Sequence, residues 1–292
     1  MSATQYTTGI MGMWNGTNDG HEDGYVDWSS GKTNINNPQE VDITVQDIRT
    51  ANPEPMFETE GYGLVNHETS LTPEQFLAGN TPEGKKYIED VYFKECAELI
   101  KEVTGSNDVL PYAFRVREQN MRPGQFSTKS LSSTVALPLA HVDRDDVTGE
   151  KSMHTLLGGR AKEVLKNGSR YAQVNVWRGI GEPIARWPLC FVNKSQIPDW
   201  KYKTHTARVF PKNDPRVAHR GEKLYDSVLK YDPRYEYHYV SSLDVNEAVV
   251  FSSFDSDVSK VTPHGAFWDE STAEDAPIRR SIEVRCWVVF DH

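Results

Sequence analysis

The 292-residue sequence predicts a mainly β protein, a jelly-roll core with helices packed on one side. Four observations lead to this fold class. An amphipathic pattern predicts a helix over residues 82–104, and short β-rich runs separated by Pro, Gly, Asn and Asp follow from about residue 108. Few helical patterns interrupt these runs, which favours a closed or sandwiched antiparallel core. No glycine-rich phosphate loop follows a strand, which argues against a nucleotide-binding α/β fold.

The elements can be assigned in chain order. Residues 15–37 are rich in Asn, Gly, Asp and Ser, which favours an irregular loop. The helix over 82–104 begins with Thr81-Pro82-Glu83, a capping residue followed by a first-turn proline and an acid, and Gly105 can end it. Strands are expected at residues 112–117, 134–142, 171–177, 189–192, 235–240, 248–251 and 281–290, with a helix near 155–166. We expect one domain over 1–292, with a loop and helical scaffold in 1–107 and the jelly-roll core in 108–292.

Composition narrows the class of partner. Lys and Arg total 32 against 42 Asp and Glu, so the formal charge is −10. An acidic chain without a basic block is not expected to bind nucleic acid or an anionic membrane. Its apolar runs are far shorter than the ~20 residues of a membrane helix, and no secretory signal is visible. Cys96, Cys190 and Cys286 are widely spaced, so we expect reduced core thiols in a cytoplasmic protein, either an enzyme or a binding module.

The motif with the most chemical content is His141-Val142-Asp143. Residues two apart on a strand point to the same face, so this pair can supply two ligands to one metal. A distant histidine would complete the two-histidine, one-carboxylate set of non-haem Fe(II) oxygenases. By itself the motif is weak, because about one His-x-Asp/Glu is expected by chance in such a composition. A structural histidine at a strand end is the alternative interpretation of His141.

Two later segments supply the remaining candidates. His264 follows the strand at 248–251 and is a plausible third ligand from a facing strand. On the last strand, Arg279 and Ser281 share one face, so a guanidinium and a hydroxyl can bind one carboxylate together. That carboxylate would be the far end of 2-oxoglutarate. A solvated strand edge is the alternative for Arg279.

Together these motifs resemble a known family, the gibberellin-desaturase-like hydroxylase/desaturase family of mostly fungal natural-product enzymes. The resemblance covers roughly residues 108–290, and its most specific piece is the strand from Arg279 to Arg285. The segments that carry it are His141-Val142-Asp143, Val176-Trp177-Arg178, Pro188-Leu189, the tyrosine-rich run from Tyr235 to Tyr239, Phe251 to Asp255, His264 and Arg279-Arg280-Ser281-Ile282-Glu283-Val284-Arg285. Where the family pattern leads us to expect a proline soon after Arg178, this chain has Gly179-Ile180-Gly181.

The resemblance implies a double-stranded β-helix fold and a dioxygenase that uses Fe(II), 2-oxoglutarate and dioxygen. Hydroxylation, desaturation or ring formation on a small natural-product or amino-acid-derived substrate would follow, as part of secondary metabolism. His141, Asp143 and His264 would be the catalytic iron ligands, and Arg279 with Ser281 would bind 2-oxoglutarate. The 123 residues between His141 and His264 are long for the wider oxygenase superfamily, which predicts an insertion at about 195–235 that could cover the active site.

Several alternatives stay open at this stage. Arg285 lies on the same strand face and is the rival binder of 2-oxoglutarate. Arg178, with Asn175, either reaches the pocket or is a structural arginine paired with an acid. The whole protein could instead be an iron oxidase without 2-oxoglutarate, or a metal-free jelly-roll binding module or inactive subunit. The family also includes partnered subunits, so a homodimer or a partner subunit is open as well.

Overall fold

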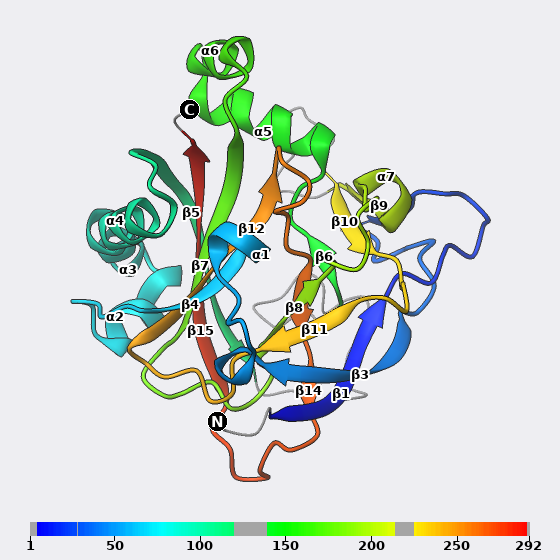
Figure 1. The fold of residues 1–292 in the computed structure, drawn as a ribbon, viewed down its shortest axis with the longest axis horizontal. Helices are drawn as coiled ribbons and strands as arrows, with labels where there is room; N and C mark the ends of the chain where they lie inside the picture. The colour runs from blue at the N-terminus through cyan, green and yellow to red at the C-terminus, as the bar shows by residue number, and fades with distance from the viewer. Residues whose placement is uncertain (1–4, 28, 120–138, 214–224, 291–292) are drawn as a thin grey trace.

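Two β-sheets form the protein, as seen in the computed structural model, which describes residues 5–27, 29–119, 139–213 and 225–290 (Figure 1). The smaller sheet has five strands and the larger has ten. Both sheets contain strands from distant parts of the chain, so the expected mainly β fold is confirmed. Within the described residues, no helix combines the length and apolarity needed to cross a membrane.

The smaller sheet is antiparallel throughout and carries the C-terminal strand near its middle. In spatial order its strands are β4 (Tyr62–Asn66), β12 (Glu247–Asp255), β7 (Tyr171–Gly179), β15 (Arg279–Val289) and β5 (Asp108–Gln119). Side chains of β15 alternate between two buried environments. Ile282 and Val284 pack with the helical layer, whereas Ser281 and Glu283 point the other way, toward the larger sheet. Period-two alternation therefore places a polar row on the inner face.

The larger sheet faces that row. Its strands, in spatial order, are β14 (Trp268–Asp269), β1 (Tyr6–Met13), β3 (Gln39–Asp47), β11 (Glu236–Tyr239), β8 (Leu189–Asn193), β13 (His264–Ala266), β6 (His141–Val142), β10 (Asp226–Leu229), β9 (Thr206–Lys212) and β2 (Gly24–Asp27). Apolar side chains from both sheets meet between them. Tyr62 and Phe251 of the smaller sheet join Phe191 of the larger sheet in one such cluster. This is the packing of a jelly-roll core.

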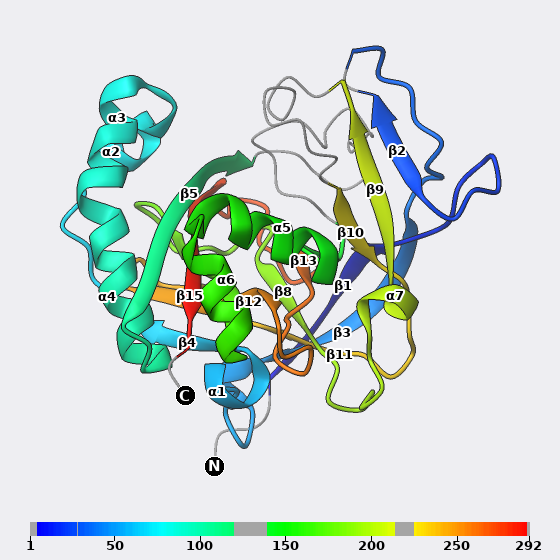
Figure 2. The same cartoon turned by 90° about the horizontal axis from the view of Figure 1, so that it is seen from above.

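Helices cover the outer face of the smaller sheet. Figures 1 and 2 show α2, α3 and α4 grouped beside it, away from β9 and β2. The helices are α1 (Phe57–Glu60), α2 (Pro73–Leu77), α3 (Pro82–Tyr87), α4 (Phe93–Thr104), α5 (Asp146–Leu157), α6 (Arg160–Asn167) and α7 (Tyr202–His205), with 3-10 turns at Ile48–Thr50 and Ala78–Asn80. A π-helical segment, Ile88–Tyr92, joins α3 to α4. The predicted helix over 82–104 is confirmed, including its Thr81 cap and its left-handed end at Gly105.

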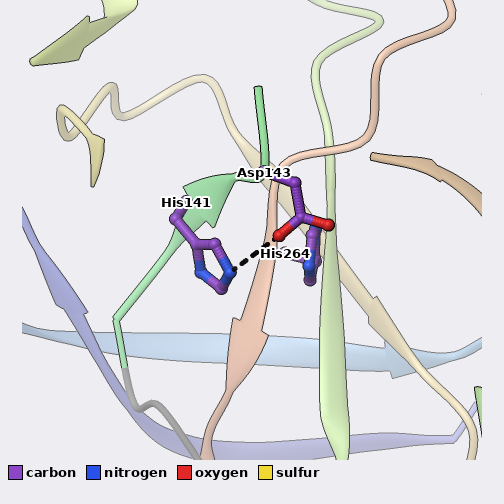
Figure 3. Close-up of side chains that lie close together, drawn as sticks. All are labelled: His141, Asp143 and His264. Carbon is purple, nitrogen blue, oxygen red and sulfur yellow. Dashed lines mark ion pairs between the residues drawn. The ribbon is translucent and has the colours of Figure 1, made fainter. Parts of the chain in front are cut away.

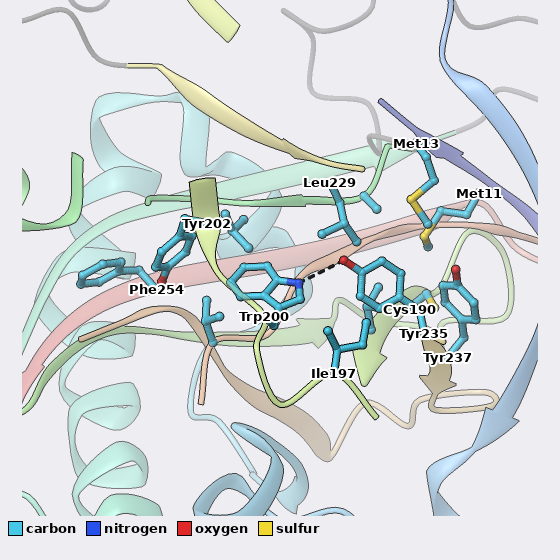
Figure 4. Packing of buried hydrophobic residues seen from close by; sticks show 14 of the residues in the cluster. Met11, Met13, Cys190, Ile197, Trp200, Tyr202, Leu229, Tyr235, Tyr237 and Phe254 are labelled. Atoms are coloured by element: carbon cyan, nitrogen blue, oxygen red, sulfur yellow. Dashed lines mark hydrogen bonds between the residues drawn. The ribbon is translucent and has the colours of Figure 1, made fainter. Parts of the chain in front are cut away.

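The N-terminal region differs from its expected role as loop and helix. It contributes β1, β2 and β3 to the larger sheet. Figure 4 shows Met11 and Met13 of β1 packed in the same core cluster as Trp200 and Tyr235, whose side chains share a hydrogen bond of 3.0 Å. The region needs this sheet because isolated strands cannot satisfy their backbone hydrogen bonds.

Two other expectations concern the middle of the chain. Residues 134–138 of the strand predicted at 134–142 lie outside the described part of the chain. The end of that predicted strand coincides with β6. The segment 195–235, expected as an insertion, contributes β9 and β10 to the larger sheet. Its residues 214–224 lie outside the described chain, so its role as a cover of the active site stays a prediction.

Candidate active site

Three potential metal ligands meet between the two sheets. His141 lies on β6, His264 lies directly opposite it on the paired strand β13, and Asp143 follows β6 by one residue. Their ligand atoms all lie within 4.8 Å of one another, and the two imidazole rings are 4.6 Å apart between centroids. Figure 3 shows the three side chains pointing toward one another, with His141 Nε2 3.8 Å from Asp143 Oδ1. The structure thus brings together all three residues predicted from the sequence.

Backbone carbonyls determine which histidine nitrogens face this centre. His141 Nδ1 lies 2.8 Å from the carbonyl oxygen of Leu139, and His264 Nδ1 lies 3.1 Å from that of Thr262. A carbonyl oxygen only accepts hydrogen bonds, so both Nδ1 atoms must carry the proton. Both Nε2 atoms then keep a lone pair, as a metal ligand requires. Burial, together with His141, lowers the pKa of His264 to about 4, so this ring is neutral near pH 7.

The Asp143 carboxylate is held by donors from the smaller sheet. Arg285 Nη2 donates to Oδ1 over 3.0 Å, while the side-chain amides of Gln173 and Asn175 donate to Oδ2. Burial by itself would raise the pKa of Asp143, but the Arg285 guanidinium and the two histidines outweigh it and hold that pKa well below its usual range. Asp143 is therefore ionised at neutral pH, which suits a ligand for a divalent cation.

Acid should destabilise the metal-free protein between about pH 6.5 and pH 4. Burial lowers the pKa of His67 and of His238 to about 4, whereas an unfolded histidine titrates near 6.5. In this window the unfolded chain binds more protons, so the free energy of unfolding falls as the pH falls, by up to about 1.4 kcal/mol per pH unit for each histidine. Urea unfolding with a chelator present, measured across this range, tests the slope. In a His238→Gln variant the free energy of unfolding should fall less steeply with pH. An unchanged slope would contradict the lowered pKa assigned to His238.

A pocket connects the three-residue cluster to the last strand. Its cavity volume is about 20 Å³, and it is lined by Arg117, His141, Leu189, His264, Gly265, Ala266, Arg279, Glu283 and Arg285. Two histidines and three arginines therefore share one pocket. Such a site favours a ligand that both coordinates a metal and carries negative charge.

Arg279 and Arg285 have different surroundings in this pocket. Arg285 lies 3.0 Å from Asp143 and 3.0 Å from Glu283, and burial alone would lower its pKa, but these carboxylates raise it. Arg279 is 2% exposed; its Nε donates to Ser281 Oγ and its Nη1 to the Trp187 carbonyl oxygen. Within the described part of the chain, no carboxylate pairs with it. Burial, with Arg117 nearby, lowers its pKa to about 9, so the folded protein bears a cost for keeping this cation charged.

Arg178 does not reach the pocket, which corrects the interpretation that it binds a cofactor. It lies on the outer face of β7 with Val174 and Val176, and its guanidinium donates to the carbonyl oxygens of His67 and Val245. Asn175, which was considered together with Arg178, does lie on the inner face, where its amide donates to Asp143. Residues three apart on a strand point to opposite faces, so this separation was visible in the sequence.

Sequence reasoning missed other residues of this site. Gln173 contacts Asp143 directly, and Arg117 lines the pocket from β5. The signal for Gln173 was its position two residues before Asn175 on the same strand. Glu283 accepts a hydrogen bond from Arg285 Nε.

Comparisons with known proteins agree with this geometry. The family model described as "Oxidoreductase/YMDC permease-like domain" matches residues 16–289. Oxidoreductase R1 of Phoma sp. is 48% identical over 97% of each chain. The Fe(II)/2-oxoglutarate-dependent dioxygenase nvfI of Aspergillus novofumigatus is 28% identical over 80% of this chain and 78% of its own, and other relatives are named hydroxylase/desaturase.

A solved structure shares the fold. The chain titled "iron and alpha-ketoglutarate-dependent endoperoxidase NvfI with different conformation" superposes with a TM-score of 0.78 at 23% identity, and the match covers all of both chains. The jelly-roll class predicted from the strand pattern is thus confirmed, as is the resemblance to fungal hydroxylase/desaturase enzymes. The chain belongs to the oxidoreductase family that includes these fungal enzymes.

Proposed function

We propose that the protein is an Fe(II)- and 2-oxoglutarate-dependent dioxygenase that oxidises a C–H bond of a small natural-product or amino-acid-derived substrate in secondary metabolism. One observation carries this proposal. His141 and His264, which cluster with Asp143, line the same pocket as Arg279, a buried arginine that forms no ion pair with a carboxylate among the described residues. The name of the relative nvfI supports the same cofactors.

The donor set fits iron. Two imidazole Nε2 lone pairs and one ionised carboxylate form the two-histidine, one-carboxylate set of non-haem Fe(II) oxygenases, which leaves other positions free. Iron bound there would activate dioxygen with electrons from 2-oxoglutarate, which would leave as succinate and carbon dioxide. The chain's own part is to hold His141 and His264 in the correct tautomer and Asp143 in its charged form.

Arg279 is the residue assigned to the far carboxylate of 2-oxoglutarate. Ser281 orients the guanidinium by accepting from Nε, and the Trp187 carbonyl holds Nη1. Glu283 only partly offsets the burial of this cation, so a bound carboxylate would stabilise its charge further, which makes binding favourable. Arg285 is assigned a different role, because Asp143 and Glu283 already neutralise it.

Anaerobic titration of the metal-free protein with Fe(II), then with 2-oxoglutarate, tests the proposal. We expect a visible iron-to-oxoacid charge-transfer band after the second addition. If iron binds and no band forms, the protein is an oxidase that does not use 2-oxoglutarate. If iron does not bind, the enzyme assignment falls and a binding role replaces it.

The proposed setting is the cytoplasm. Cys96, Cys190 and Cys286 are buried free thiols, the form that a reducing compartment maintains. A small-molecule substrate, rather than nucleic acid or a membrane, is the partner proposed for a chain with a formal charge of −10.

A further inference from the structure

We propose that Gln173 and Asn175 are positioning residues for the metal centre. They hold one oxygen of Asp143, Oδ2, so that the other oxygen, Oδ1, is the atom presented to the metal. The inference rests on the proposed function, because it assigns a role toward the metal that the three ligands would bind. It concerns residues that neither bind the metal nor line the pocket.

The contacts divide the two carboxylate oxygens between different tasks. Gln173 Nε2 donates to Oδ2 over 2.8 Å and Asn175 Nδ2 donates to the same oxygen over 3.0 Å. Both amides are fully buried. Oδ1 accepts only from Arg285 among the described residues and is the oxygen that faces His141 Nε2 at 3.8 Å. With two donors on Oδ2, Oδ1 is the oxygen with a lone pair to spare for a metal.

Two hydroxyl groups determine which way each amide points. The Tyr112 hydroxyl donates to Gln173 Oε1, and the Ser253 hydroxyl has two acceptors in reach, Asn175 Oδ1 at 3.0 Å and the Gln173 carbonyl oxygen at 3.2 Å. Asn175 Oδ1 also accepts from Gln173 Nε2 over 3.4 Å. Gln173 Nε2 also donates to Ser253 Oγ over 2.7 Å. An amide whose oxygen accepts from a hydroxyl must direct its nitrogen elsewhere, and in both cases the nitrogen faces Asp143. The network is therefore directional, from the hydroxyls through the amides to the carboxylate.

This arrangement has a consequence for metal binding. Two donors on Oδ2 oppose a rotation that would offer both oxygens, so Asp143 would bind a metal through Oδ1. Single-atom binding keeps more positions around the metal open for cosubstrate and dioxygen. Loss of a residue that hydrogen-bonds to a metal ligand typically weakens metal affinity about 10- to 100-fold.

Titration with Co(II) tests the inference, because Co(II) binds nitrogen and oxygen donors, and its visible bands report coordination number and geometry. We expect Gln173→Met and Asn175→Leu each to weaken Co(II) binding by about 10-fold or more and to alter the bands. Tyr112→Phe retains the Gln173 amide but removes the group that orients it, so its loss of affinity should be smaller. Val176→Ala is the matched control, a change on the same strand whose side chain faces the helical layer.

The outcomes separate the inference from the proposed function. Val176→Ala should lower the unfolding temperature and leave the Co(II) affinity and bands unchanged. If the Gln173 and Asn175 variants behave like Val176→Ala, the amides are only structural and the inference is wrong. If the unaltered protein does not bind Co(II), the proposed metal centre itself is wrong.

Discussion

Replacement of His264 by alanine should abolish both tight Fe(II) binding and turnover. His264 supplies one of three ligands and is held by the Thr262 carbonyl with its Nε2 toward Asp143 and His141. Two remaining ligands cannot hold a divalent ion that normally binds to three. The loss of Fe(II) affinity should therefore exceed the roughly 10- to 100-fold loss that follows when a residue hydrogen-bonded to a metal ligand is removed. Anaerobic Fe(II) titration with an optical readout measures the affinity directly.

A second buried histidine provides the control. His238 is 7% exposed, lies on β11 and contacts the Tyr62 hydroxyl rather than the cluster. His238→Ala should bind Fe(II) as the unaltered protein does, although it removes the same kind of side chain from a buried site. Unfolding of both variants without metal identifies any loss of fold. Retained Fe(II) affinity in a folded His264→Ala protein would show that this histidine is not a ligand.

The second large effect is expected at Arg279. Arg279→Ala should raise the KM for 2-oxoglutarate by about 30-fold or more, because loss of one partner of a buried charge pair costs at least about 2 kcal/mol. Arg279→Lys should recover only part of this, since an ammonium cannot donate to a carboxylate, Ser281 and the Trp187 carbonyl in the same forked geometry. Succinate production measured against 2-oxoglutarate concentration gives the KM.

The neighbouring arginine is the matched control. Arg280 precedes Ser281 on the same strand, points to the opposite face and forms an exposed pair with Glu118. Arg280→Ala should leave the KM for 2-oxoglutarate unchanged, because exposed pairs of this kind contribute little. If a higher substrate concentration restores the Arg279→Ala enzyme and more 2-oxoglutarate does not, Arg279 binds the carboxylate of the substrate instead.

Local pattern accounts for the expectations that held. The class of fold follows from short strands with turn residues between them, and the shared face of Arg279 and Ser281 follows from period-two alternation on one strand. Those are properties of neighbouring residues. The strands in the N-terminal region were missed although Val41, Ile43 and Val45 alternate on β3, because a run between loop-like segments gave no sign of the sheet it joins.

What the sequence by itself determined is the set of side chains able to do the chemistry and the strand face that each shares with its neighbours. Only the tertiary structure decided which face turns inward and what lies across from it. Arg279 and Arg285 share one face of β15, but Asp143, which directly follows β6 of the other sheet, pairs with Arg285, whereas no carboxylate of the described residues forms an ion pair with Arg279. β7 is buried on both faces, so the burial pattern alone could not show that Gln173 and Asn175 face Asp143 and that Arg178 does not. Strand alternation is local, whereas charge pairing depends on distance in space, and the fold alone brings those groups together.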